Sequence, residues 1–277
     1  MELINIPLEA LDVAFFQLGC NDQIQPNWVH EKSVPFGIIA QVYVGEYEVT
    51  CAGQTIWVRA PEAFLTPAHQ PMRIVHHTNR RQRFAARWLH FSFVLYQTID
   101  LTSLLDMPLR VDARRGRELS LIMQELIQLK GSESLEAIRH SIRWRELMWR
   151  ILRIVCEISA FKADAEDRLK AGQKLAPLLT HLKNNLAQPL SVSQMAELVN
   201  MSVSRFFAFF QDKMGCSPME YAKRVRLNEA ASQFSLTDRL LKEVAANTGF
   251  ANPFHLSREF KRQFGLSPKA YRALHPT

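Results

Sequence analysis

The first part of the chain alternates short apolar runs with turn residues, a pattern typical of β-strands. Residues 36–44 (FGIIAQVYV) and 84–93 (FAARWLHFSF) are rich in β-branched and aromatic side chains, and glycines and prolines separate such runs. Because side chains alternate across a pleat, Trp88 and His90 are expected on one face of the 84–93 strand. The spacing predicts six or more strands in a small sandwich or barrel.

From residue 113 onward the hydrophobic period becomes helical. Residues 118–129 predict an amphipathic helix, and residues 133–161 predict a long helix with two apolar stripes, one through Ile138 and Ile142 and the other through Ile151. A helix that is apolar on two sides needs two partners. We expect its own β domain on one side and a second subunit on the other, which would make the protein a homodimer; enclosure within one chain is the alternative.

The charged segment 162–172 (KADAEDRLKAG) lacks an apolar stripe and predicts a linker or a frayed helix end. The predicted domains are therefore residues 1–165 and 171–277. Together these patterns predict an α+β protein, with an N-terminal β-sandwich or β-barrel that carries dimerisation helices and a C-terminal all-α domain.

Charge is divided unevenly between the two parts. Residues 1–170 hold 20 basic and 20 acidic residues, whereas residues 171–277 hold 14 basic and 7 acidic ones, so the whole net charge of +7 lies in the last third of the chain. A neutral domain joined to a basic one favours a polyanionic partner for the basic domain. A basic surface without a partner is the alternative.

Composition excludes several classes of protein. With 47% hydrophobic and 22% charged residues among 277, global disorder is excluded. No apolar run approaches the roughly 18–20 residues that span a bilayer, so no membrane partner is expected. The N-terminus lacks the basic region of a secretory signal, and the four cysteines are widely spaced, as expected for reduced thiols. These features predict a cytoplasmic protein.

The last third of the chain contains an internal repeat, whose copies are offset by 50 residues from their second helix onward. Each copy reads as a helix, a tight turn and a second helix. Asn200 and Gly249 lie in the turns, where a positive φ is expected, and Ser202 and Asn252 are the expected N-caps of the second helices. Further matched pairs are Ala196 and Ala245, Phe210 and Phe260, Gly215 and Gly265, Pro218 and Pro268, and Tyr221 and Tyr271.

Over residues 173–275 the sequence resembles the AraC/XylS family of transcription regulators, and the string GFANPFHLSREFKRQFGLSPKAYR is its most specific part. The resemblance implies two helix-turn-helix units joined by a long helix over residues 218–234, which holds the recognition helices about 34 Å apart in successive major grooves of double-stranded DNA. The residues that carry it are Ala196, Ser202, Phe210, Gly215, Ser217, Pro218, Tyr221, Arg226, Ala230, Val244, Ala245, Gly249, Phe250, Phe260, Lys261, Gly265, Ser267, Pro268, Tyr271 and Arg272.

Matched positions within the resemblance imply which residues contact DNA. Arg258 is the foremost candidate, because a guanidinium pairs bidentately with guanine. Phe207 departs from the polar residues that are common at its position, and a core role for Phe207 is the alternative. The implied base contacts are Ser204, Arg205, Phe207 and Ala208 in the first unit and Phe254, His255, Ser257 and Arg258 in the second, with Lys213, Arg224, Lys261 and Arg262 as implied phosphate contacts.

The β region resembles the cupin-like effector domain that members of the family often carry. The resemblance rests on the strand spacing, on Gly45, Gly53 and Pro61, and on the strand end at 88–91. It implies that a small-molecule effector, a sugar or a related metabolite, binds at His30, Trp88 and His90. The alternative is that Trp88 and His90 are packed residues of the barrel with no ligand.

No catalytic constellation is visible, so no enzyme activity, metal or cofactor is expected. His76 and His77 are adjacent in a predicted strand, point to opposite faces and cannot share a metal. The sequence therefore predicts an effector-controlled transcription regulator that also contacts RNA polymerase; whether it is an activator or a repressor stays open. Two alternatives stay open: a metal-dependent cupin enzyme fused to a DNA-binding tail, and a regulator that a protein partner controls.

Overall fold

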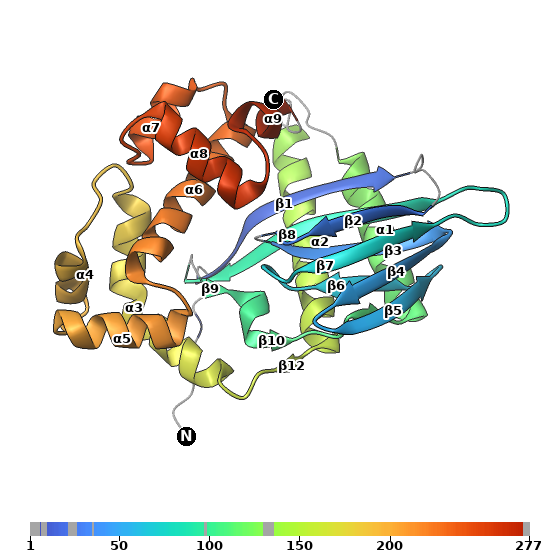
Figure 1. Ribbon diagram of the computed structural model, residues 1–277, viewed down its shortest axis with the longest axis horizontal. Coiled ribbons are helices and arrows are strands. Elements are labelled where there is room, and N and C mark those ends of the chain that lie inside the picture. The colour runs from blue at the N-terminus through green and yellow to red at the C-terminus, as the bar shows by residue number, and fades with distance from the viewer. Residues whose placement is uncertain are drawn as a thin grey trace. The chain divides into compact units, whose positions relative to one another are not determined.

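The computed structural model describes residues 6, 10–21, 27–34, 36–96, 99–129 and 136–273 (Figure 1). These residues form two compact units. The sheet unit comprises Phe15–Phe93 and Thr102–Lys162; the helical unit comprises Ala163–Thr277 together with Met1–Ala14 and Val94–Leu101, as far as these ranges are described. Within the described ranges, no helix is both long enough and apolar enough to cross a bilayer.

Two antiparallel sheets build the sheet unit, as the strand pattern predicts. The larger has the order β1-β8-β3-β6-β11, with β9 beside β8, and the smaller has the order β2-β7-β4-β5. The strands of the larger sheet are β1 (Leu11–Asn21), β3 (Gly37–Val44), β6 (Ala63–Thr66), β8 (Ala85–Leu95), β9 (Ile99–Asp100) and β11 (Arg110–Val111). Those of the smaller sheet are β2 (Trp28–Lys32), β4 (Glu46–Cys51), β5 (Gln54–Arg59) and β7 (Met72–His77).

The core of this unit lies between the two sheets. Ile38 and Ala40 of β3 face Val49 of β4 and Ile74 of β7 within one buried cluster. Alternate residues point inward, and β4 shows this as a regular alternation of buried and half-buried positions, whereas β3 and β6 are buried on both faces over most of their length. The described strands pair as two facing sheets, and Trp88 of β8 packs against the edge of their common core.

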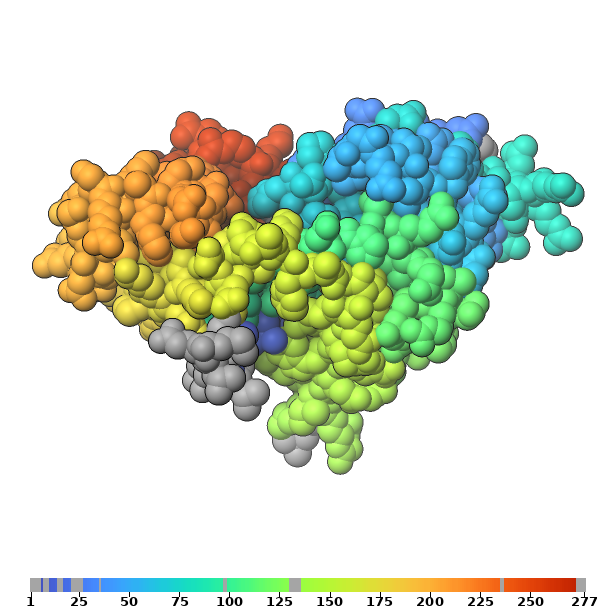
Figure 2. Space-filling model, turned by 90° about the horizontal axis from the view of Figure 1, so that it is seen from below, coloured from blue at the N-terminus to red at the C-terminus, as the bar shows by residue number. Residues whose placement is uncertain are grey.

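Two helices, α1 (Ala113–Gln128) and α2 (Glu136–Ile158), pack side by side in the sheet unit (Figure 2). The α2 stripe through Ile151 is buried, as predicted, whereas Ile138 and Ile142 of the other stripe are 58% and 63% exposed. The short strands β10 (Leu105–Asp106) and β12 (Ala160–Phe161) pair after the 3-10 helix η2 (Leu101–Leu104).

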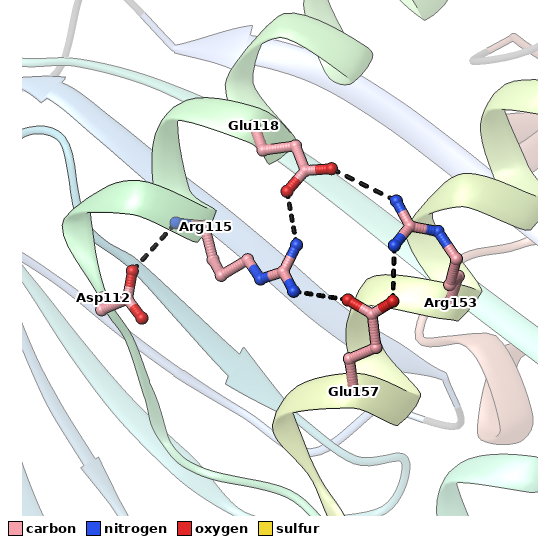
Figure 3. A network of polar contacts seen from close by, with 5 residues as sticks. All are labelled: Asp112, Arg115, Glu118, Arg153 and Glu157. Atoms are coloured by element: carbon pink, nitrogen blue, oxygen red, sulfur yellow. Dashed lines mark hydrogen bonds and ion pairs between the residues drawn. The ribbon is translucent and has the colours of Figure 1, made fainter.

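Ion pairs fasten α1 to α2 (Figure 3). Arg115 contacts both Glu118 of its own helix and Glu157 of α2, and Arg153 of α2 contacts the same two carboxylates. Asp112 begins α1, since its Oδ1 accepts a hydrogen bond of 2.9 Å from the backbone N–H of Arg115. Each carboxylate is thus shared by two guanidiniums, which fixes the relative position of the two helices.

The helical unit begins with α3 (Ala165–Asn184), so the linker expected over residues 162–172 is a helix for most of its length. Up to Gly172 its buried residues are small, namely Ala165, Ala171 and Gly172, and buried leucines follow from Leu175 onward. A Cβ at Gly172 would lie 2.2 Å from Cδ1 of Ile99, which shows how closely the neighbouring segment approaches. A stripe of alanine and glycine carries little hydrophobic signal, and for that reason the sequence pattern did not reveal it.

The remaining helices form the predicted repeat: α4 (Val192–Leu198), α5 (Val203–Met214), α6 (Pro218–Leu236), α7 (Leu241–Asn247), α8 (Pro253–Phe264) and α9 (Pro268–Ala273). The turns contain Asn200 with a φ of 53° and Gly249 with a φ of 71°, which confirms the predicted left-handed positions. Asn252 caps α8, whereas Ser202 occupies the N-cap position of α5 without a side-chain cap hydrogen bond.

Candidate nucleic-acid interface and small-molecule pocket

The first helix-turn-helix unit buries one face of α5 and exposes the other. Phe206 and Phe210 are fully buried in a cluster with α3 and α4, whereas Phe207 is 44% exposed. The core alternative for Phe207 is therefore wrong, because the neighbouring phenylalanines supply the core. The other predicted base contacts of this helix, Ser204, Arg205 and Ala208, are exposed as well.

The second unit presents α8 in the same way. Leu256 and Phe260 are buried, whereas Phe254 is 86% exposed and the Arg258 side chain is 76% exposed. His255 is half-buried against the ring of Phe250, with ring centroids 5.4 Å apart, and Ser257 is also half-buried. Phe254 and Arg258, one turn apart, are thus the outermost side chains among the four predicted base contacts of this helix.

The four residues predicted to contact phosphates differ in whether their side chains already have a partner within the helical unit. Lys261 is exposed and makes no ion pair within the described part of the chain. Lys213 lies 3.1 Å from Asp212, whose carboxylate raises the pKa of the lysine. Arg224 is half-buried and bonds to the thiol of Cys216, and Arg262 pairs with Glu259.

Glu259 is a residue of this surface that sequence reasoning missed. Its side chain is 7% exposed, and its carboxylate contacts Arg262, Arg258 (3.6 Å) and Lys223 of α6 (3.4 Å). Burial alone would raise the pKa of Glu259, but Arg262 and Lys223 hold it below its usual value. An acidic residue at a core-facing position beside three cations was the signal available in the sequence.

Arg226 of α6 fixes the turn of the second unit. Its Nη1 donates a 3.1 Å hydrogen bond to the carbonyl of Gly249, and its guanidinium lies 5.3 Å from the centroid of the Phe250 ring. The connecting helix α6 is therefore bound to the second unit at this turn, and the Glu259 contacts bind it to α8 as well.

In the sheet unit, six strands (β2, β3, β4, β6, β7 and β8) surround a cavity of about 160 Å³. It opens between the inner faces of the two sheets, where strand pairing sets Trp88 opposite Ala40 and His30 opposite Ile74. The three predicted effector residues, His30, Trp88 and His90, all line it. The remaining lining residues are Trp28, Lys32, Ile38, Ala40, Tyr47, Phe64, Ile74 and His76.

Aromatic rings are stacked around this cavity. The ring centroids of Trp88 and His90 lie 4.6 Å apart, which confirms that the two residues share a face, and those of Trp28 and His30 lie 4.9 Å apart. The Nδ1 atom of His76 is 3.0 Å from the carbonyl oxygen of Trp28. Trp28, Lys32, Tyr47 and His76 were missed, because only the pairing of β7 with β2 on one side and β4 on the other brings them to this place.

Among the side chains that line the cavity, Lys32 carries a positive charge at neutral pH. Burial lowers the pKa of His90 to about 3 and that of His76 to about 4, and it lowers the pKa of His30 too. Burial lowers the pKa of Lys32 to about 8, so Lys32 stays protonated at neutral pH while the three imidazoles are neutral. The cavity can therefore offer one ammonium group, neutral ring N–H groups and flat apolar walls.

His76 and His77 point to opposite faces, as predicted. His76 is buried in the cavity wall, whereas Nε2 of His77 lies 3.1 Å from Glu48 and its ring stacks on Trp57 outside the sheet. Within the described ranges, no group of three histidine, cysteine or acidic side chains is placed to hold a metal ion.

Two family models match the sequence. An "AraC-like ligand binding domain" matches residues 18–148, and a "Helix-turn-helix domain" matches residues 195–274. The first range contains every residue that lines the cavity, and the second contains every residue predicted to contact a base.

Curated relatives share part of the chain. The probable transcriptional regulator LumQ of Photobacterium leiognathi is 29% identical over 92 residues, which are 33% of this chain and 37% of LumQ. The transcriptional activator RhaS of Klebsiella pneumoniae (strain 342) is 26% identical over 137 residues, which are 50% of this chain and 48% of RhaS. The chain thus spans less than half the length of each of these two relatives.

A solved structure covers nearly the whole chain. The structure of unsaturated fatty acid bound wild-type ToxT from Vibrio cholerae strain SCE256 has a TM-score of 0.54, covers 94% of this chain and 96% of its own, and is 11% identical. At this identity the likeness shows the fold alone. It confirms the expected α+β fold with a sheet-rich N-terminal part and a helical C-terminal part.

Proposed function

This chain belongs to the AraC family of transcription regulators, and from that premise we propose that it binds a specific site on double-stranded DNA and regulates transcription in response to a small molecule. We also propose the functional domains 1–165 and 171–277. One observation carries the proposal: the chain contains two helix-turn-helix units, and the second helix of each has a buried aromatic face and an exposed face.

The contacts with DNA follow from exposure and charge. Arg258 and Phe254 extend furthest from α8, so we assign them base contacts in the major groove, with His255 and Ser257 at closer range. Ser204, Arg205, Phe207 and Ala208 take the same role on α5. The +7 net charge of residues 171–277 supplies the attraction to phosphates, to which Lys261 is the best placed of Lys213, Arg224, Lys261 and Arg262.

The cavity of the sheet unit is the proposed effector site. Its lining contains His30, Trp88 and His90, and it lies wholly within the range that matches a ligand-binding domain. The solved structure of ToxT, whose fold is similar, contains a bound unsaturated fatty acid, so a protein of this fold has room for a small organic ligand. We infer that the ligand changes how the helical unit engages DNA.

The remaining parts of the proposal concern assembly and place. The exposed stripe through Ile138 and Ile142 supports a homodimer, because adjacent exposed isoleucines on one helix face favour burial against a partner. We propose a non-enzymatic, cytoplasmic protein that activates transcription through RNA polymerase, since the named relatives are regulators and RhaS is named an activator.

A selection of DNA ligands by the full-length protein tests the proposal. From a pool of random double-stranded DNA, the protein should enrich one sequence with two half-sites about one helical turn apart, and its affinity should fall steeply with salt. The double variant Arg205→Ala/Arg258→Ala should lose the enrichment. The variant Arg81→Ala, at an exposed arginine of the sheet unit, should keep it. Equal enrichment by all three proteins would overturn the assignment of Arg205 and Arg258 to base contacts, and a wild type that enriches no sequence would overturn the proposed DNA binding.

A further inference from the structure

Lys32 stands at the junction of two spaces in the sheet unit. It lines the cavity between the sheets, and it also lines an open groove of about 600 Å³ that includes Cys51, Gln70 and Arg73. Strand pairing sets Lys32 of β2 opposite Met72 of β7, at the end of the small sheet. A molecule that enters the cavity from the groove therefore passes the ammonium group of Lys32.

This ammonium group has no counter-charge. Within the described part of the chain Lys32 makes no ion pair, and burial is the cause of its lowered pKa. Glu31, the neighbouring acid, is 3.7 Å from Arg73 instead. The cavity lining contains no carboxylate at all among the described residues. A half-buried cation without a partner costs free energy, and an anionic ligand would offset that cost.

The rest of the cavity suits a flat apolar body. The indoles of Trp28 and Trp88 line it together with Ile38, Ile74 and Phe64. The Nδ1 atom of His90 is buried without a hydrogen-bond partner in the described structure, so the imidazole has a polar atom to offer a ligand. Asn, Gln, Ser and Thr, which serve the many hydroxyls of a sugar, are absent from the described lining.

We propose that the cavity takes a small carboxylate with a planar apolar body, bound through its carboxylate to Lys32 and through its flat face to Trp28 and Trp88. This ligand class replaces the sugar that the family resemblance implied. Its role as an effector rests on the proposed function, whereas the binding chemistry does not.

Benzoate and its neutral counterpart benzamide are the matched probes, because they differ in the charged group and hardly in shape. In isothermal titration with the full-length protein and no DNA, benzoate should bind at least tenfold more tightly than benzamide. Lys32→Met should remove this difference, and Lys32→Arg should retain most of it. Lys162→Met, an exposed lysine of the same unit outside the cavity, is the control. Thermal melting of each variant shows that it is folded.

Three results would overturn the ligand class: benzamide binding as tightly as benzoate, no binding of benzoate to the wild type, or benzoate binding that Lys32→Met leaves unchanged. D-Glucose and L-arabinose serve as sugar probes, and tighter binding of either than of benzoate would also overturn it. Benzoate binding by a protein that selects no DNA would contradict the proposed regulator and leave the pocket chemistry standing. Selective DNA binding without benzoate binding would do the reverse.

Discussion

The Nζ atom of Lys223 lies 3.4 Å from Oε2 of Glu259, and this contact joins the connecting helix α6 to the second recognition helix α8. Lys223 also lies 2.6 Å from Glu220 of its own helix, so its ammonium group bridges two carboxylates. Arg226 adds a second link from α6, to the turn before α8. The orientation of α8 on the connecting helix is therefore fixed by charge as well as by the aromatic core.

Glu259→Gln should destabilise the helical unit. The buried carboxylate is replaced by a neutral amide, and Lys223 and Arg262 lose their common partner, which should cost about 1–3 kcal/mol in the free energy of unfolding. Urea unfolding followed by far-UV circular dichroism measures it. Glu197→Gln, an exposed acid on α4, is the matched control and should change the free energy of unfolding little.

The stability that Glu259 contributes should also depend on pH. Because folding lowers the pKa of Glu259, this stability should be present above the pKa that the carboxyl has in the unfolded chain, and it should be lost as the pH falls through the pKa in the folded protein.

Arg258→Ala and Lys261→Ala should weaken DNA binding in different ways. Arg258 is assigned to a base, so its loss should cost about 1–3 kcal/mol on the best site and relax preference at one base pair. Lys261 is assigned to a phosphate, so its loss should weaken all sequences about equally and reduce the salt slope by about one unit. Selection from randomised sites separates the two. A uniform loss for Arg258→Ala with an unchanged sequence preference would make Arg258 a backbone contact.

Trp88 is held in place by a glycine on the neighbouring strand. A Cβ at Gly19 would lie 2.7 Å from Cζ2 of Trp88, so Gly19→Ala should displace the indole. We expect weaker benzoate binding with ligand-independent DNA binding nearly intact, and Trp88→Ala should abolish the benzoate response. Cys20→Ala, at the exposed neighbour of Gly19, should bind benzoate like the wild type. Unchanged benzoate binding in both Gly19→Ala and Trp88→Ala would favour the alternative of packed residues without a ligand.

Ile142→Glu should separate a dimer without unfolding the chain. Ile142 is 63% exposed, so a charge there meets water in a monomer but is buried if the stripe contacts a second subunit. Sedimentation should show a shift from dimer to monomer at tens of micromolar, with an unchanged melting temperature. Ser141→Glu, at the exposed residue just before Ile142, is the control. A wild-type protein that is strictly monomeric would remove the prediction.

The helical unit was predictable from the sequence because its signals are local. A turn such as that at Gly249 can be recognised from residue types that tolerate a positive φ, and both copies of the repeat contain such a residue. The cavity was predictable only in part. His30 and His90 were expected, but Lys32 joins them through the pairing of β2 with β7, two strands about 40 residues apart whose register no local rule sets. Glu259 escaped notice for a similar reason, since its partner Lys223 lies on another helix.

The sheet unit should lose stability on mild acidification because three histidines with lowered pKa values, His30, His90 and His76, line its cavity. The folded pKa of His76, about 4, lies below the ordinary value of 6.5. Above pH 6.5 the imidazole is neutral in both states and has no effect. As the pH falls from 6.5 toward 4, the unfolded chain takes up a proton that the folded chain does not. Unfolding is thereby favoured by about 2 kcal/mol at pH 5.

Tryptophan fluorescence can follow this loss, because all five tryptophans lie in the sheet unit. His76→Gln should melt at a temperature that depends less on pH between 7 and 5 than that of the wild type. His77→Gln, at the next residue on the outer face beside Glu48, is the control for the loss of a histidine side chain at this end of β7. If the melting temperatures of wild type and His76→Gln depend equally on pH, His76 does not take up a proton on unfolding in this range and is not the group responsible.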